Sequence, residues 1–348
     1  MTNKTLFLHV GAGKTGSTAI QQFLKKNRET LADFGYEVPR TGIIDEGMTF
    51  AHHPLTEWVE GYRQVDSEPL WNEIASTARG HVVISSEAFH NRIAAKGGEE
   101  FFEKIRKIFR GFEVRIIFYI RRQDQWLESV YEQWIKSGNL RSGVSIAEFV
   151  QSYKRDLPAQ IFAFEKVFGT DSILVRPYEK SQLVNGDAAK DFLSLLGIPE
   201  NERLIYSERN PNPRLTREAL VFARWYNWSC SNERESVAVR QQLLEFSRLV
   251  SSERTGTRYS VHDSLPSKLR REIFDRHTGD YQEIAKRFLG RPEGRLFYDE
   301  PKFADDVASR TNCPLDVEAF VRMEAFLYKN LHDRLDKLEE NLSKANDN

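Results

Sequence analysis

The segment from Thr5 to Gln22, TLFLHVGAGKTGSTAIQQ, constrains the fold more than any other part of the chain. An apolar run enters a glycine-rich turn that carries Lys14, and an amphipathic segment follows. Gly11, Gly13 and Gly16 let the backbone curl so that its N–H groups point inward. A helix that opens after this turn adds its own N–H groups and the positive end of its dipole. The segment therefore predicts a strand, an anion-binding loop and a helix, with phosphate or sulfate as the ligand.

This loop differs from the nucleoside-triphosphate loop G-x-x-x-x-G-K-[ST]. Counting back from Gly13 and Lys14, the first glycine of that motif would fall where the chain has Leu8. The Walker motif is therefore broken, which disfavours an ATP-dependent small-molecule kinase. The structural alternative is an ordinary strand-to-helix turn. Lys14 and the run Gly16-Ser17-Thr18 favour the anion site over that alternative.

A second segment joins the apolar run Val114–Ile120 to the sequence RRQDQWLESVYEQWIK. In it, Arg121 and Ser129 are eight residues apart. A strand end and the second turn of the following helix can converge on one phosphate, which arginine meets with its planar fork and serine with its hydroxyl. The alternative for Arg121 and Arg122 is a pair of solvated charges that ends a strand.

Together the two segments resemble the sulfotransferases that use 3′-phosphoadenosine 5′-phosphosulfate (PAPS), especially the bacterial and carbohydrate-directed ones. GAGKTGST resembles their 5′-phosphosulfate loop, and Arg121 with Ser129 resembles their 3′-phosphate site. Three further matches extend the likeness from about residue 5 to about residue 215: SSEAF at Ser85–Phe89, ILVRPYE at Ile173–Glu179 and FLSLLGIP at Phe192–Pro199.

The resemblance implies an enzyme that transfers a sulfuryl group from PAPS to a hydroxyl or amine, on a carbohydrate or glycoconjugate acceptor. It implies that Lys14 stabilises the leaving phosphate. The residues implied to hold the 5′-phosphosulfate are Lys14, Thr15, Gly16, Ser17 and Thr18, and those implied to hold the 3′-phosphate are Arg121 and Ser129. No metal is expected, because no metal-ligand constellation appears. A non-catalytic nucleotide-binding scaffold is the remaining alternative, which would keep the phosphate sites but need no base.

The acceptor's proton needs a base close to the anion loop. Glu87 follows the apolar run His81–Ile84, which places it at the carboxyl edge of the predicted sheet, where open α/β folds bind ligands. We expect Glu87 to be the catalytic base; the alternative is that it caps a helix beginning near Phe89. Competing histidines, each a candidate for substrate contact, are His52, His53 and His90.

The pattern of apolar runs and periodic helices predicts an α/β fold with a P-loop-kinase-like parallel sheet of five strands flanked by helices. The expected strands are Thr5–Val10, Tyr36–Val38, His81–Ser85, Val114–Ile120 and Ser172–Arg176. One helix is expected to bury Ile20, Phe23, Leu24 and Leu31 and to stop at Gly35, and another to follow Arg122 and stop at Gly138.

Beyond about residue 208, the sequence is rich in charged residues and its pattern predicts helices and no strands. We expect a sulfotransferase core over residues 1–207 and a mainly helical extension over 208–348. Arg209 and Arg214, in a proline-rich break, are candidates for reaching a phosphate from a loop. Val317–Leu342 carries Leu331, Leu335, Leu338 and Leu342 at 4-3-4 spacing, which predicts a helix docked on the body or, alternatively, a short coiled coil that makes an oligomer.

Composition excludes several classes of protein. With 50 basic and 51 acidic residues the net charge is −1, so no bulk attraction to nucleic acid or to an anionic membrane follows. Cys230 and Cys313 form neither a metal spacing nor a disulfide framework, which fits a reducing compartment. No apolar run approaches the length of a membrane span, and no leader pattern is present. Cytoplasm is the expected location.

Overall fold

The structure is a computed structural model, and it describes residues 4–47, 49–59, 63–64, 66–140, 143–206, 215–230, 233–253, 264–299 and 317–346. The chain forms two compact units, each discontinuous in sequence. The first contains residues 1–126, 154–211 and 272–302, and the second contains 127–153, 212–271 and 303–348. The expected division into a sulfotransferase core over residues 1–207 and a helical extension over 208–348 stays a prediction.

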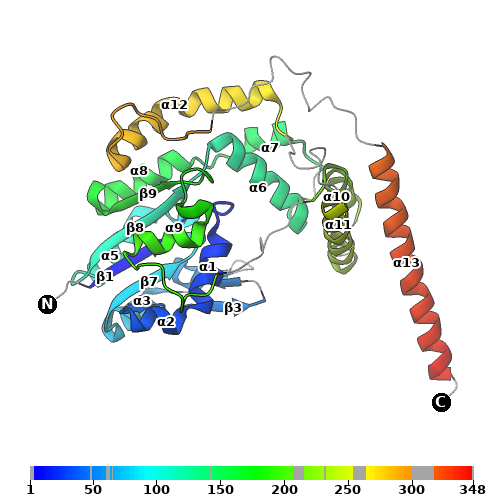
Figure 1. The fold of residues 1–348 in the computed structure, drawn as a ribbon, viewed down its shortest axis with the longest axis horizontal. Coiled ribbons are helices and arrows are strands. Elements are labelled where there is room, and N and C mark those ends of the chain that lie inside the picture. The colour runs from blue at the N-terminus through cyan, green and yellow to red at the C-terminus, as the bar shows by residue number, and fades with distance from the viewer. Residues whose placement is uncertain are drawn as a thin grey trace. The chain divides into compact units, whose positions relative to one another are not determined.

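The first unit is built on a five-stranded parallel sheet (Figure 1). Its strands, in spatial order, are β2 (Tyr36–Glu37), β7 (His81–Ser85), β1 (Thr5–His9), β8 (Glu113–Ile120) and β9 (Ile173–Pro177). All five expected strands are confirmed, with ends that shift by at most one residue. The chain leaves β1 toward one side and returns to its other side at β8, so β1 lies at the switch point where open α/β sheets bind ligands.

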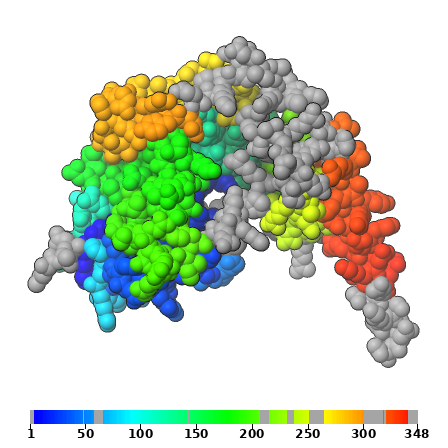
Figure 2. Space-filling view, viewed as in Figure 1, coloured from blue at the N-terminus to red at the C-terminus, as the bar shows by residue number. Residues whose placement is uncertain are grey.

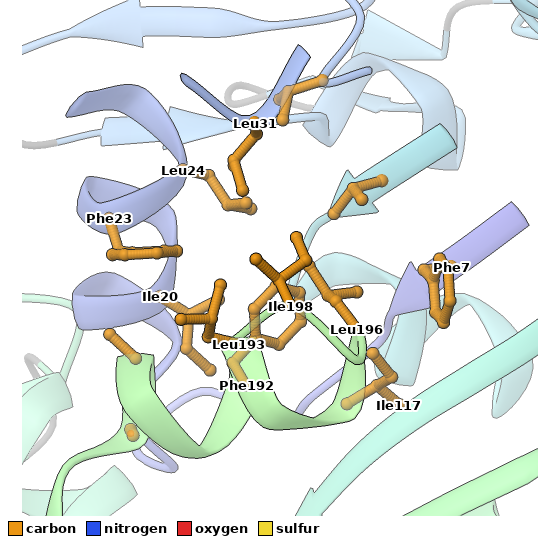
Figure 3. Packing of buried hydrophobic residues seen from close by; sticks show 14 of the residues in the cluster. Phe7, Ile20, Phe23, Leu24, Leu31, Ile117, Phe192, Leu193, Leu196 and Ile198 are labelled. Carbon is orange, nitrogen blue, oxygen red and sulfur yellow. The ribbon is translucent and has the colours of Figure 1, made fainter. Parts of the chain in front are cut away.

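Side chains of the sheet alternate between its two faces, as strand geometry requires. On one face, Phe7 and Ile117 pack with Ile20 and Phe23 of α1 and with Phe192 of α9, as Figure 3 shows. On the other face, Phe118 meets Phe164 of α8 with ring centroids 6.3 Å apart. Both faces are therefore buried, which explains why the central strands read as continuous apolar runs.

The helices of the first unit cover both faces of this sheet. They are α1 (Ser17–Lys26), α2 (Arg28–Asp33), α3 (Glu68–Thr77), α4 (Ala88–Ile93), α5 (Gly98–Ile108), α8 (Leu157–Phe168) and α9 (Ala188–Leu195), with short 3₁₀ turns η1 (His53–Thr56), η2 (Thr170–Ser172) and η3 (Val184–Gly186). Two small antiparallel hairpins, β3 (Ile44–Glu46) with β4 (Thr49–Ala51) and β5 (Trp58–Val59) with β6 (Arg63–Gln64), complete the unit.

The expected single helix from Ser17 to Gly35 is wrong in one respect, because it breaks at Asn27 into α1 and α2. The Asn27 side chain donates to the Phe23 carbonyl at 2.9 Å and to the Ile205 carbonyl at 2.8 Å, and it accepts the Ile205 N–H at 2.7 Å. An asparagine that binds backbone competes with the helix's own hydrogen bonds. Leu31 is nevertheless buried, and Gly35 ends α2 with a φ of +83°.

Two helices span the boundary between the units: α6 (Gln123–Ser137), which stops at Gly138 as expected, and α12 (Ser267–Leu289). The second unit adds α7 (Ile146–Ser152), α10 (Arg217–Ser229), α11 (Glu233–Glu253) and α13 (Val317–Asn346). In this unit the buried Glu128 carboxylate binds Arg270 Nη2 at 2.9 Å and the Leu265 N–H at 2.9 Å. A buried charge paired in this way avoids the cost of an unpartnered one.

Helix α13 packs on other helices of the second unit over only part of its length, and its expected docking on the core stays a prediction. Helix α13 packs on α10 and α11, with Met323 fully buried and the Phe326 ring 5.7 Å from the ring of Phe246. Leu331, Leu335 and Leu338, in contrast, are 52%, 46% and 58% exposed. The leucine stripe is therefore not the docked face.

Candidate active site

The loop after β1 has a tight backbone with two residues in the left-handed region. Lys14 has a φ of +70° and Gly16 a φ of +83°, and the Thr15 hydroxyl donates to the Ala12 carbonyl at 2.5 Å. Gly16 is the N-cap of α1, and its carbonyl accepts the Ala19 and Ile20 N–H groups. The first N–H groups of a helix have no partner within the helix and point out of its N-terminus. A non-glycine residue in the left-handed region, here Lys14, is a strained conformation typical of functional loops.

Two side chains from the β8–α6 segment contact this loop. Trp126 Nε1 donates to the Gly13 carbonyl at 2.9 Å, and Arg121 Nη1 lies 3.5 Å from the Lys14 carbonyl. Arg121 follows β8, the strand that pairs with β1, so its guanidinium reaches the loop from the neighbouring strand end. The sheet thus brings together Lys14 and Arg121, which are 107 residues apart in sequence.

Ser129, the other member of the second motif, lies in the second turn of α6 and is 7% exposed. It belongs to the second unit, whereas Arg121 belongs to the first. The convergence of Arg121 and Ser129 on one phosphate therefore stays a prediction. Arg209 and Arg214 lie outside the described residues.

Glu87 stands two residues after β7, at the N-cap position of α4, but its side chain makes no capping hydrogen bond. Its carboxylate instead accepts a hydrogen bond of 2.6 Å from Gln21 Nε2, on the helix that follows the anion loop. The other carboxylate oxygen lies 3.9 Å from His53 Nε2. The Glu87 side chain is 32% exposed, so a carboxylate tied to α1 remains accessible to solvent.

The three candidate histidines differ in their surroundings. His52 is buried, with Nε2 3.2 Å from the Pro39 carbonyl and Nδ1 accepting the Ser85 N–H at 3.3 Å. His90 is also buried, and its Nδ1 contacts the Glu87 carbonyl. Burial lowers the pKa of both imidazoles to about 4, so both are neutral at pH 7.

His53 differs from the other two because it reaches the Glu87 carboxylate. Its Nδ1 lies 2.8 Å from the Ser86 hydroxyl, which leaves Nε2 directed at Glu87. The side chain is 16% exposed. Of the three histidines, His53 is therefore the one whose ring nitrogen faces the Glu87 carboxylate.

Two polar side chains next to the candidate site, His9 and Gln21, were given no role from the sequence. His9 ends β1, is fully buried, and has Nδ1 2.8 Å from the Ser85 hydroxyl. Within the described residues its Nε2 has no hydrogen-bond partner, and a Cβ on Gly11 would lie 2.8 Å from that atom. Burial lowers the pKa of His9 to about 4. The sequence signal that could have indicated them is a polar residue on an otherwise apolar stripe. His9 is such a residue in the strand, and Gln21 in the helix.

In the described part of the chain, no group of three or more His, Cys, Asp or Glu side chains is arranged to hold a metal ion. Among the helices that the structure describes, none is both long and apolar enough to cross a lipid bilayer.

Comparison with known proteins gives limited matches. No family model matches the chain. An uncharacterized protein of Archaeoglobus fulgidus is 34% identical over 146 residues, which is 42% of this chain and 38% of that protein. The match thus spans well under half of the relative's length. The crystal structure of a sulfotransferase from Alicyclobacillus acidocaldarius matches with a TM-score of 0.38 and 15% identity, over 69% of this chain and 95% of the other.

Proposed function

We propose that the chain is a sulfotransferase that moves a sulfuryl group from PAPS to a hydroxyl or amine. The observation that carries the proposal is the approach of the Arg121 guanidinium to the carbonyl of Lys14, at 3.5 Å. An arginine beside a loop that carries a lysine can bind a ligand with two anionic groups, one at each cationic side chain. PAPS carries two such groups, the 5′-phosphosulfate and the 3′-phosphate, whereas ATP has no 3′-phosphate.

The donor set matches this ligand in chemistry. Lys14, Thr15, Gly16, Ser17 and Thr18 would hold the 5′-phosphosulfate through backbone N–H groups, hydroxyls and the ammonium group. Arg121 and Ser129 would hold the 3′-phosphate. Lys14 would also neutralise the charge that builds up on the leaving phosphate, which is why its contribution should be larger in the transition state.

Glu87 is the base in this proposal. The lone pair of the acceptor oxygen or nitrogen forms a bond to sulfur, the bond from sulfur to the 5′-phosphate oxygen breaks, and the acceptor proton passes to the Glu87 carboxylate. The hydrogen bond from Gln21 supports this role, because it orients the carboxylate, and His53 Nε2 lies 3.9 Å from the other carboxylate oxygen. His52 and His90 are less suited, because both are buried with ring nitrogens facing backbone groups. A carbohydrate or glycoconjugate acceptor is proposed from the resemblance in sequence.

Ligand binding provides the first test. We expect adenosine 3′,5′-bisphosphate, the product of the reaction, to raise the melting temperature of the protein, and ATP with Mg²⁺ to raise it less. The opposite order would favour an ATP-dependent kinase and overturn the proposal.

Catalysis provides the second test, with mass spectrometry used to detect sulfation of a panel of carbohydrate hydroxyls and amines. Glu87→Gln keeps the shape and the hydrogen bond to Gln21 but loses the proton acceptor. It should lower turnover by roughly 10²–10⁴ while leaving bisphosphate affinity nearly intact. His53→Gln is the matched control; if it abolishes turnover while Glu87→Gln stays active, the base is His53. Bisphosphate binding without transfer to any acceptor would favour the non-catalytic scaffold.

A further inference from the structure

Helix α13 of the second unit carries an apolar stripe that the described residues of the chain do not cover. We call Tyr328, Leu331, Leu335 and Leu338 the leucine seam; their exposed fractions are 68%, 52%, 46% and 58%. Figure 2 shows α13 in red. Large apolar side chains gathered in one row mark an interaction surface more than scattered ones do.

The docked face of α13 is a different one. Met323 is fully buried and Phe326 meets Phe246, whereas the seam residues remain exposed. The helix therefore presents two apolar faces, one packed within the unit and one that the described residues leave exposed.

The seam has the spacing of a coiled coil. Its residues alternate by three and four, which corresponds to the a and d positions of a heptad with Tyr328 and Leu335 at a. A repeat of 3.5 residues keeps such a row facing a partner helix only when two helices wrap around each other with a left-handed twist. The four exposed residues of the seam span positions 328–338, about one and a half heptads within a helix of 30 residues.

We propose that α13 is a dimerisation helix, and that two copies of this chain pair through the leucine seam as a parallel, two-stranded coiled coil. The charged residues beside the seam favour a second copy of this chain as the partner. Arg334 occupies the g position and Glu339 the following e position. In a parallel, in-register pair, Arg334 of each copy meets Glu339 of the other, and two-fold symmetry repeats the contact. An antiparallel pair centred on Leu331 and Leu335 would instead oppose two Arg334 side chains.

The oligomeric state of the full chain tests this proposal, by light scattering after size exclusion at several concentrations. We expect a mass of twice the 40.4 kDa of one chain. Leu335→Asp combined with Leu338→Asp should give a single-chain mass, with the far-ultraviolet circular dichroism and the bisphosphate affinity retained. Lys337→Asp, which makes the same change in net charge outside the seam, should remain a dimer. A wild-type monomer at every concentration, or a dimer that persists in the double aspartate variant, would overturn the proposal.

Exchanging the charges of Arg334 and Glu339 tests whether these residues pair between two copies, and a cysteine variant tests whether the two helices run parallel. Arg334→Glu and Glu339→Arg should each weaken the dimer by roughly ten-fold, and the two together should restore it, because the pair is re-formed with its signs reversed. Leu335→Cys, with Cys230 and Cys313 changed to serine, should form an intermolecular disulfide, because identical positions meet only in a parallel pair. Additive weakening in the charge double variant would refute the Arg334–Glu339 pairing. Failure of the cysteine variant to cross-link would refute the parallel direction.

Discussion

Alanine substitutions at Gly16 and Gly13 test which glycine of the loop after β1 is needed for stability and which for ligand binding. Gly16 has a φ of +83°, and a Cβ there would lie 2.8 Å from Tyr178 Cε2 and 2.9 Å from Ala188 Cβ. A left-handed conformation costs an alanine about 1–2 kcal/mol. Overpacking against a ring and a helix start adds about 1–3 kcal/mol. We therefore expect Gly16→Ala to lower the free energy of unfolding by about 2–5 kcal/mol.

Gly13→Ala is the matched control in the same loop, because a Cβ on Gly13 meets no atom within 4 Å. Thermal and urea unfolding should show Gly16→Ala melting on the order of 10 °C below the wild type. Gly13→Ala should stay within about 1 kcal/mol of the wild type. Calorimetry should show that Gly13→Ala still weakens the bisphosphate, since its methyl group enters the space that a ligand would approach. Equal stabilities for the Gly16 variant and the wild type would refute the steric reasoning.

Three further predictions concern the charges of the site. Lys14→Ala should raise the barrier to transfer by about 2–4 kcal/mol and weaken the bisphosphate less; turnover within a few-fold of wild type would remove Lys14 from catalysis. Arg121→Ala should weaken adenosine 3′,5′-bisphosphate by about 1.5–3 kcal/mol and leave 5′-AMP nearly unchanged in calorimetry; equal losses would mean that Arg121 acts elsewhere. Burial lowers the pKa of His9, His52 and His90 from 6.5 to about 4, so between those pH values only the unfolded chain is protonated at these positions. Stability should therefore be full above pH 7 and fall by several kcal/mol toward pH 4 in urea titrations, and a flat profile would contradict their burial.

The sheet and its loop could be predicted from sequence because their signals are local. Buried parallel strands are continuous apolar runs, and the glycines and Lys14 of the loop follow the first of them directly. The break at Asn27 could not be predicted in this way, because its cause is Ile205, which is 178 residues away in sequence. A periodic apolar stripe continues across that position, so the pattern indicated one helix where two exist.

The surroundings of individual polar side chains could not be predicted from the sequence either. His52 and His53 are identical in kind and adjacent, yet one is enclosed by backbone groups of Pro39 and Ser85 and the other reaches Glu87. The turn η1, which begins at His53, sends the two side chains in different directions. Such a difference depends on the packing of distant segments, which no local pattern reports.

The central position of β1 has a consequence for how the protein becomes active as it is made. Strand β1 pairs with β7 and β8 but with no strand adjacent to it in sequence. The Lys14 loop is held by Trp126, 113 residues further along the chain. A nascent chain on the ribosome therefore cannot close the loop until about residue 126 has emerged, and these non-local pairings are slow to form. Bisphosphate affinity should consequently develop only after β8 and the start of α6 have joined β1, which makes the ligand a reporter of that step of assembly.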